Sequence, residues 1–153
     1  DGRERAMSAG YSGTPLTRKL GIRPGARVAA LEPPAHLPEL LGELPEDAGL
    51  EAEPSIPPDV DGPGAREHDV VLLFCADAST LERRFDEGRR LLAWDGGLWV
   101  CWPKLSSPRA ADLRQSDVQA VGLAAGLVDN KICAIDSDWS GLRFVHRRED
   151  RPG

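Results

Sequence analysis

The side chains most able to bind a ligand lie just after the predicted strands of this chain. One of them ends the segment DGGLWVCWPK (95–104), where Lys104 is one of only 3 lysines beside 16 arginines. Ligands of open α/β sheets bind beyond the carboxyl ends of the parallel strands. The candidate ligand-binding residues at this edge are Glu32, Asp77, Lys104, Ser106, Ser107, Asp136, Asp138 and Trp139.

Lys104 has two predicted roles at this edge. A lysine among carboxylates is most often a structural ion-pair partner, and we expect that role first. The alternative is contact with an anion, in which the hydroxyls of Ser106 and Ser107 help to hold a phosphate or carboxylate. Trp139, in a predicted turn, is the aromatic side chain that we expect to be exposed for contact.

Three patterns resemble known sites only in part. GYSG (10–13) does not match the G-x-S-x-G elbow of hydrolases, no strand precedes it, and no histidine–acid pair is spaced to serve it. It favours a helix-entry turn, and Ser12 stays a candidate ligand contact. DSDWSG (136–141) matches the start of a calcium-binding loop, but Arg147 stands where that loop needs a glutamate, so a hairpin turn is favoured. The 3 histidines lack ligand spacing. No metal or other cofactor is therefore predicted.

The composition indicates an acidic globular protein. The chain has 153 residues, a net charge of −6 and a pI of about 5.1, so its field repels nucleic acid. Arginine pairs at 83–84, 89–90 and 147–148 have acidic neighbours and are expected to be solvated. No run approaches about 18 apolar residues, so no membrane span is predicted. Three cysteines without C-x-x-C spacing indicate reduced thiols and a cytoplasmic protein.

The first half of the chain predicts short elements. A helix is expected within 10–21, with Thr14 as N-cap, Pro15 in the first turn and Gly21 just after the end. The segments expected after it are a strand at 27–31, a helix at 36–44, a strand at 50–56 and a loop rich in Pro, Gly and Asp at 57–68.

The second half has stronger periodicity. DVVLLFCA (69–76) is continuously apolar, as in a parallel strand that is covered on both faces. Two helices follow later in the chain, and each begins with a predicted capping box. The residues of these boxes are Ser79 with Glu82 and Ser116 with Gln119.

The remaining strands flank the second of these helices. A WDGG turn precedes the strand LWVCW, whose Trp99 and Trp102 point to opposite faces and are expected in the core. The segment NKICAIDSDWSGLRFVHRR predicts a hairpin with its turn at 136–141.

This order of elements predicts an α/β fold. Strands that alternate with helices form a parallel sheet with right-handed crossovers, and the hairpin adds antiparallel strands at one edge. We therefore predict one three-layer α/β/α Rossmann-like domain over 10–148, closed by a C-terminal antiparallel β-hairpin. Residues 1–9 are expected to be a flexible leader or an expression remnant, and 149–153 a tail.

Two resemblances agree with this fold. DVVLLF, LLAWDGGLWV and DSDWSGLRFV together resemble the second half of a class I methyltransferase, over about residues 69–147. Nearly the whole chain resembles a family of small bacterial, actinobacterial-type proteins of unknown function. GYSGTPLTRKLGI (10–22) matches its GYSGTPL-x-x-KLGI start, and WPKLS (102–106) matches its WPK-x-S motif. The second resemblance implies a fold and no activity.

The chain departs from methyltransferases where the methyl donor binds. Such a site needs a glycine-rich turn after the first strand, but here LEPPAHL places Glu32, Pro33 and Pro34 there. Proline fixes φ and removes a backbone donor. The acidic residue that binds a ribose at the end of the second strand is also expected to be absent, because SIPP (55–58) lies there. We interpret the cofactor site as lost or never present.

The sequence therefore favours a non-catalytic Rossmann-like protein. We expect it to bind a partner protein or a small anionic ligand at the carboxyl edge of its sheet. The alternative is an enzyme, either a divergent methyltransferase-like protein or a lyase or isomerase that uses Lys104 with Asp77 or Asp136. A third alternative is a structural accessory protein. The sequence specifies no oligomeric state.

Overall fold

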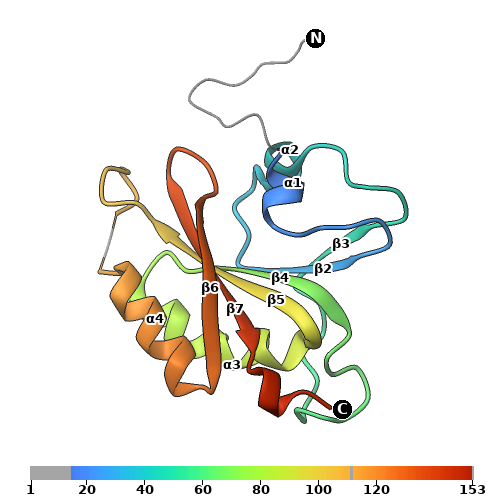
Figure 1. Ribbon diagram of the computed structural model, residues 1–153. Helices are drawn as coiled ribbons and strands as arrows, with labels where there is room; N and C mark the ends of the chain where they lie inside the picture. The colour runs from blue at the N-terminus through green and yellow to red at the C-terminus, as the bar shows by residue number, and fades with distance from the viewer. Residues whose placement is uncertain (1–14, 111, 153) are drawn as a thin grey trace.

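Six strands form one central sheet in the computed structural model, which describes residues 15–110 and 112–152. The strands are β2 (Arg27–Leu31), β3 (Gly49–Ala52), β4 (His68–Phe74), β5 (Leu92–Pro103), β6 (Leu127–Ala134) and β7 (Trp139–His146). Their order is β3-β2-β4-β5-β7-β6 (Figure 1). The first four pair in parallel, and β7 pairs antiparallel with both β5 and β6. The predicted mostly parallel sheet with a closing antiparallel hairpin is confirmed.

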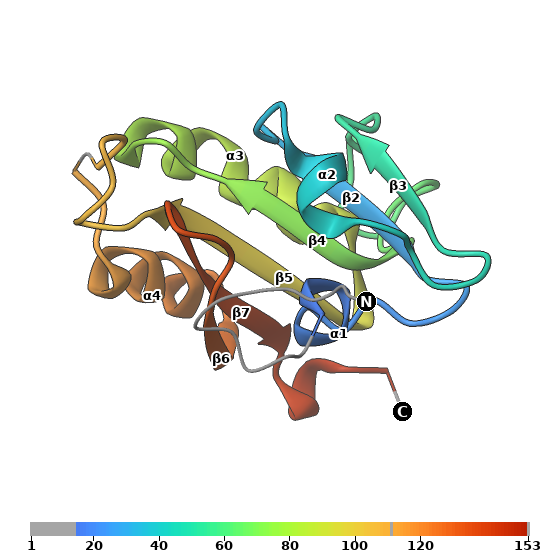
Figure 2. The same cartoon turned by 90° about the horizontal axis from the view of Figure 1, so that it is seen from above.

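Helices cover both faces of the sheet. Figure 1 shows α1 (Leu16–Lys19) and α2 (Leu37–Leu41) above it and α3 (Ala78–Leu91) and α4 (Gln115–Ala124) below it, and Figure 2 looks down on α1 and α2. Successive strand residues point to opposite faces, so each central strand contributes to two apolar cores. This burial on both faces explains the continuous apolar run of β4.

Two strands differ in length from the prediction. β3 ends at Ala52 instead of reaching 56, because Glu53 adopts a φ of 50° that takes the chain out of the extended conformation. β5 already begins at Leu92, so the expected WDGG turn lies inside this strand. A methyl group on Gly96 would lie 2.6 Å from the Asp69 carbonyl oxygen. This glycine therefore permits a close backbone approach to β4 rather than a turn.

Both predicted capping boxes are wrong by two residues. The N-cap of α3 is Asp77, whose Oδ1 accepts hydrogen bonds from the backbone N–H and the hydroxyl of Thr80, both at 2.8 Å. The N-cap of α4 is Arg114, whose N–H donates to Asp117 Oδ2 at 3.0 Å. In both helices an aspartate carboxylate, not the predicted serine, accepts the N–H groups left free at the N-terminus.

The two helices of the other face are shorter than predicted. Pro15 precedes α1, and the predicted N-cap Thr14 lies outside the described residues. Gly21 follows α1 with a φ of 80°, as expected for a helix end. Gly42, with a φ of 68°, ends α2 before the predicted residue 44. None of the helices within 15–110 and 112–152 has the length and apolarity to cross a membrane.

The two tryptophans of β5 confirm the predicted alternation. Trp99 belongs to the core beneath α1 and α2, and Trp102 belongs to the core against α3 and α4. Trp99 is fully buried, and its indole N–H donates to the Leu20 carbonyl at 3.0 Å. This bond ties the end of α1 directly to the centre of the sheet.

Candidate functional site

The carboxyl edge of the sheet carries most of the predicted site residues, but they fall into two hydrogen-bonded groups. One group is centred on Arg84 of α3 and includes Glu32, which follows β2. The other surrounds the turn between β6 and β7 and includes Asp136, Asp138 and Ser107. Among the described residues no hydrogen bond joins the two groups. Asp77 caps α3, and Ser12 lies outside the described residues.

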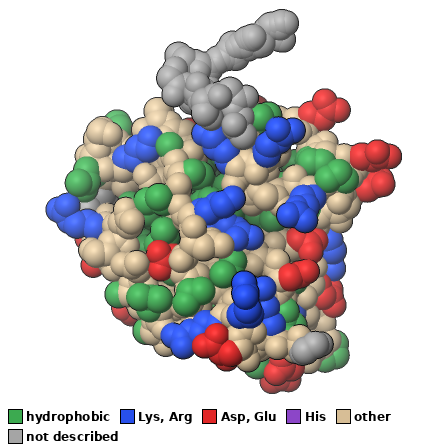
Figure 3. Space-filling view, viewed as in Figure 1, with side chains coloured by type: hydrophobic (Ala, Val, Ile, Leu, Met, Phe, Trp, Pro, Cys, Tyr) green, Lys and Arg blue, Asp and Glu red, His purple; other side chains and the backbone are tan. Residues whose placement is uncertain are grey.

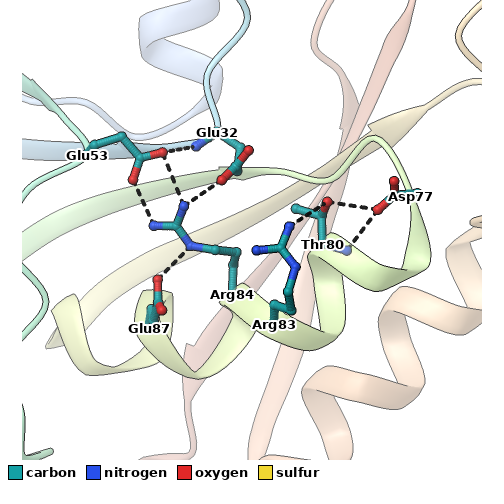
Figure 4. Close-up of polar contacts among 7 residues, drawn as sticks. All are labelled: Glu32, Glu53, Asp77, Thr80, Arg83, Arg84 and Glu87. Carbon is teal, nitrogen blue, oxygen red and sulfur yellow. Dashed lines mark hydrogen bonds and ion pairs between the residues drawn. The ribbon is translucent and has the colours of Figure 1, made fainter.

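Arg84 pairs with three carboxylates, and we name these four residues the Arg84 cluster (Figure 4). Its Nη1 lies 2.6 Å from Glu32 Oε2, its Nη2 lies 2.8 Å from Glu53 Oε1, and its Nε lies 2.6 Å from Glu87 Oε1. Only 13 % of the Arg84 side chain is exposed. The prediction that this arginine is solvated is therefore wrong, because its guanidinium joins the ends of β2 and β3 to α3.

Glu53 corrects the interpretation of the second strand. Since β3 ends at Ala52, Glu53 rather than SIPP occupies the carboxyl end of that strand. Its N–H donates to the Ala30 carbonyl at 2.8 Å, which holds it beside the end of β2. In dinucleotide-binding folds an acid about 20 residues after the phosphate turn binds the ribose hydroxyls. An acidic residue, Glu53, thus lies at the strand end where the sequence predicted none.

Both carboxylate oxygens of Glu53 nevertheless accept hydrogen bonds within the protein, while 45 % of its side chain is exposed. Its Oε1 pairs with Arg84, and its Oε2 accepts from the Glu32 N–H at 2.8 Å and from Arg84 Nη1 at 3.2 Å. The hydrogen bond from Arg84 lowers the pKa of Glu53, against an opposing effect of burial. The Glu53 carboxylate is therefore charged at neutral pH and neutralised by an internal partner.

Replacing Arg84 by methionine tests this pairing. A pKa that is lowered on folding stabilises the protein above the carboxyl's ordinary pKa, 4.5 for glutamate, and that stability is lost as the pH falls. We expect Arg84→Met to lower the free energy of unfolding by about 1–2 kcal/mol at pH 7. The difference from wild type should shrink towards about pH 3. Urea unfolding at both pH values measures it.

Arg83→Met is the matched control for this experiment. Arg83 is exposed on the next position of α3, and among the described residues its side chain makes only a 3.5 Å contact with the Thr80 hydroxyl. We expect it to change stability by less than about 0.5 kcal/mol. An Arg84→Met effect that is equally large at both pH values would contradict the role given to the carboxylates.

Asp136 and Asp138 shape the turn between β6 and β7. Asp136 Oδ1 accepts from the N–H groups of Asp138 and Trp139, both at 2.8 Å, and Asp138 Oδ1 accepts from the Ser107 hydroxyl at 3.0 Å. These contacts are typical of aspartate-stabilised turns, and the hairpin predicted for DSDWSG is confirmed. Asp136 Oδ2 also lies 3.0 Å from His36 Nε2, which joins this turn to the start of α2.

Trp139 is not the exposed contact residue that the sequence predicted. It is the first residue of β7 and only 4 % exposed. Its ring meets Phe74 edge to face, with centroids 5.2 Å apart. The prediction placed Trp139 in the turn, but strand pairing begins at this residue and points its side chain into the core beneath α1 and α2.

Lys104 has a fixed backbone, and its side chain forms no ion pair with the residues that the structure describes. Its N–H donates to the Asp138 carbonyl at 2.8 Å, and its own carbonyl accepts from the Ser107 N–H at 3.0 Å. Its half-buried side chain pairs with no carboxylate in 15–110 or 112–152. Ser106 beside it is exposed, whereas the Ser107 hydroxyl already bonds to Asp138.

The thiol nearest this edge is unsuited to nucleophilic chemistry. Cys75 directly follows β4 and is fully buried. Burial raises the pKa of its thiol to about 12. Since the thiolate is the nucleophile, Cys75 is unreactive at neutral pH.

Comparisons with known proteins place the fold. No family model matches the sequence, and no curated protein matches it. A SAM-dependent methyltransferase from Aquifex aeolicus superposes with a TM-score of 0.59 at 12 % identity, over 84 % of this chain and 86 % of that one. A TehB-like SAM-dependent methyltransferase from Corynebacterium glutamicum gives 0.53 at 12 %, over 86 % and 85 %. The chain has a methyltransferase-like fold. Identities this low show the fold alone.

Proposed function

We propose that this protein is a non-catalytic binding protein with a methyltransferase-like fold, and that it binds a small anionic ligand instead of a methyl donor. The observation that carries this proposal is the Arg84 cluster. A ribose at Glu53 would compete with Arg84, a guanidinium that is 13 % exposed and pairs with three carboxylates. Freeing Glu53 would take a partner from the Arg84 guanidinium, which is itself largely shielded from water, and that is costly.

The turn before α2 supports the same conclusion. Close approach of a ligand to backbone N–H groups requires glycine at this turn, and two prolines stand there. Pro33 and Pro34 have no N–H to donate. The strand end that would hold a methyl donor thus has two turn residues without an N–H group, and its acid is paired with Arg84.

The anion contact of this proposal is Lys104. Lys104 is a half-buried residue without a carboxylate partner among the described residues, and a charge that water screens less attracts a phosphate or carboxylate more strongly. The exposed hydroxyl of Ser106 is available to donate a second hydrogen bond. Both side chains lie at the carboxyl end of β5, the edge at which open α/β sheets bind ligands.

Two binding measurements test the proposal. In isothermal titration calorimetry we expect no saturable heat with S-adenosylmethionine or S-adenosylhomocysteine. In a thermal-shift screen of phosphorylated and carboxylated metabolites, we expect at least one compound to raise the Tm of wild type. At 100 times its Kd a ligand adds about 2.7 kcal/mol, or roughly 5–10 °C for a chain of this size.

Substitutions at Lys104 supply the controls. Lys104→Met keeps the aliphatic stem and is expected to abolish the shift, whereas Lys104→Arg keeps the charge and should retain most of it. An equal shift in wild type and Lys104→Met would contradict the assigned contact. A saturable isotherm with S-adenosylmethionine would overturn the proposal itself.

A second candidate function is a divergent methyltransferase. The observation that favours it is Glu53 at the end of β3, the position of a ribose-binding acid. This candidate requires Arg84 to release Glu53 when the donor binds. It would produce S-adenosylmethionine binding that Glu53→Gln weakens, together with transfer of a labelled methyl group to an acceptor.

A further inference from the structure

A hollow of about 660 Å³ lies near the amino ends of β2, β4 and β5, away from Lys104. Its walls come from α1 and the loop after it, from the first parts of β4 and β5, and from β6 and β7. Figure 3 shows Lys and Arg side chains gathered on this face of the molecule, over α1 and the β6–β7 pair. The cations that line the hollow are Lys19, Arg23, Lys131 and Arg143.

None of these four cations forms an ion pair with a carboxylate of the described residues. By contrast, five arginines of the described residues form ion pairs with carboxylates: Arg27, Arg66, Arg84, Arg89 and Arg90. The hollow also contains the carboxylates of Asp69 and Asp95, so it holds two more positive than negative charges. In a protein with a net charge of −6, this concentration of cations makes the hollow locally attractive to an anion.

Arg143 is the most firmly placed of the four. Its guanidinium lies over Gly97 of β5, where any side chain on residue 97 would overlap it. Its side chain makes one hydrogen bond among the described residues, at 3.4 Å to Asn130 Oδ1. A guanidinium has five N–H donors, so most of them are left for a ligand. Burial, and then the neighbouring charges of Arg23 and Arg151, lower the pKa of Arg143, in agreement with the lack of an ion pair to a described carboxylate.

We infer that this hollow binds a small polyanion, a molecule with two or more phosphate or carboxylate groups. Cations from α1 and the loop after it, from β6 and from β7 surround it, so a ligand with several charged groups can contact more than one of them at once. Its volume lies within the range of small-molecule sites, roughly 300–1,000 Å³. Planar guanidinium groups suit bidentate contacts with phosphate or carboxylate oxygens. This site does not depend on the function proposed for the carboxyl edge.

Calorimetry with simple probes tests the inference. Pyrophosphate, tripolyphosphate, citrate and orthophosphate are titrated into the full chain at low ionic strength, about 20 mM, where screening is weak. We expect saturable binding of at least one multiply charged probe and weaker binding of orthophosphate. Lys131→Gln removes an exposed cation on β6. It should weaken binding by about tenfold, which corresponds to the loss of one charge-assisted hydrogen bond. Arg143→Gln should weaken it by at least as much.

Matched variants distinguish binding in the hollow from a general attraction of anions to the protein surface. Arg18→Gln removes an exposed positive charge next to Lys19 on α1, but Arg18 does not line the hollow. We expect it to change the Kd by less than about twofold. Lys104→Met should bind the probes like wild type, so the two proposed sites fail or succeed separately. Far-UV circular dichroism and the Tm verify that each variant is folded. If Arg143→Gln does not fold, Lys131→Gln still provides the test, because residue 131 is exposed.

Three results would overturn the inference. The first is the absence of saturable binding of every probe by wild type. The second is equal affinity of wild type and Lys131→Gln, since an exposed cation of the hollow would then contribute nothing. The third is equal weakening by Arg18→Gln and Lys131→Gln, which would indicate diffuse surface attraction instead of a site.

Discussion

Trp99→Ala is expected to lower the free energy of unfolding by about 3–5 kcal/mol. The Trp99 side chain is fully buried in the core beneath α1 and α2 and is the largest of the completely buried side chains. Its removal leaves a cavity and also leaves the Leu20 carbonyl without its indole donor. Because domains are stable by about 5–15 kcal/mol, this change removes a large share of the total. Urea unfolding followed by far-UV circular dichroism measures it.

Trp99→Phe separates the packing from the hydrogen bond. Phenylalanine keeps an aromatic ring in the core but cannot donate to Leu20, so we expect a smaller loss, about 1–3 kcal/mol. A loss below about 1 kcal/mol for Trp99→Ala would contradict the close packing between α1 and β5. The result also matters for the hollow, because α1 carries Lys19 and is held to the sheet by this bond.

Gly122→Ala is expected to destabilise the protein by about 2–3 kcal/mol. In an exposed helix interior, alanine is more stable than glycine by about 1 kcal/mol. At Gly122 of α4, however, the added methyl group would overlap the ring of Phe144 in β7. That ring is fully buried and packs edge to face on Phe85, with centroids 5.9 Å apart, so it has little room to move. Overpacking therefore outweighs the gain in helix propensity.

Gly88→Ala is the matched substitution in the neighbouring helix. The methyl group at Gly88 of α3 would lie 3.3 Å from Leu98 Cδ1, the flexible end of a side chain. We expect a stability within about 0.5 kcal/mol of wild type, since a small shift of Leu98 offsets the contact. Chemical unfolding of both variants compares them directly. If Gly122→Ala is as stable as Gly88→Ala, the packing of α4 on β7 is not as close as the structure shows.

Local sequence patterns were sufficient for the main features of the fold. The apolar run of β4 predicted a strand covered on both faces, and the alternation at Trp99 and Trp102 predicted their opposite cores. These features depend on neighbouring residues, so periodicity reveals them. The ends of elements were predicted less well. The caps of α3 and α4 lie two residues before the predicted serines, because nearby aspartates compete for the same N–H groups.

The tertiary structure alone decided how the polar residues meet. Arg84 pairs with Glu53 and Glu32, which are 31 and 52 residues away, and no local pattern links them. Their meeting depends on where β3 ends and how it pairs with β2, and a short, mostly exposed strand gives a weak sequence signal. Because this signal did not reveal where β3 ends, the acid at the end of that strand, Glu53, was expected to be absent.

Sequence and tertiary structure thus determined different properties of this protein. The sequence by itself determined the α/β class, the central parallel strands and the closing hairpin, because hydrophobic burial follows short periods of 2 and about 3.6 residues. Only the tertiary structure decided that Arg84 neutralises the acid at the end of β3, that Trp139 is buried, and that four cations without an ion pair among the described residues surround one hollow. Each of these depends on the register and packing of segments far apart in the chain, which residue spacing does not encode.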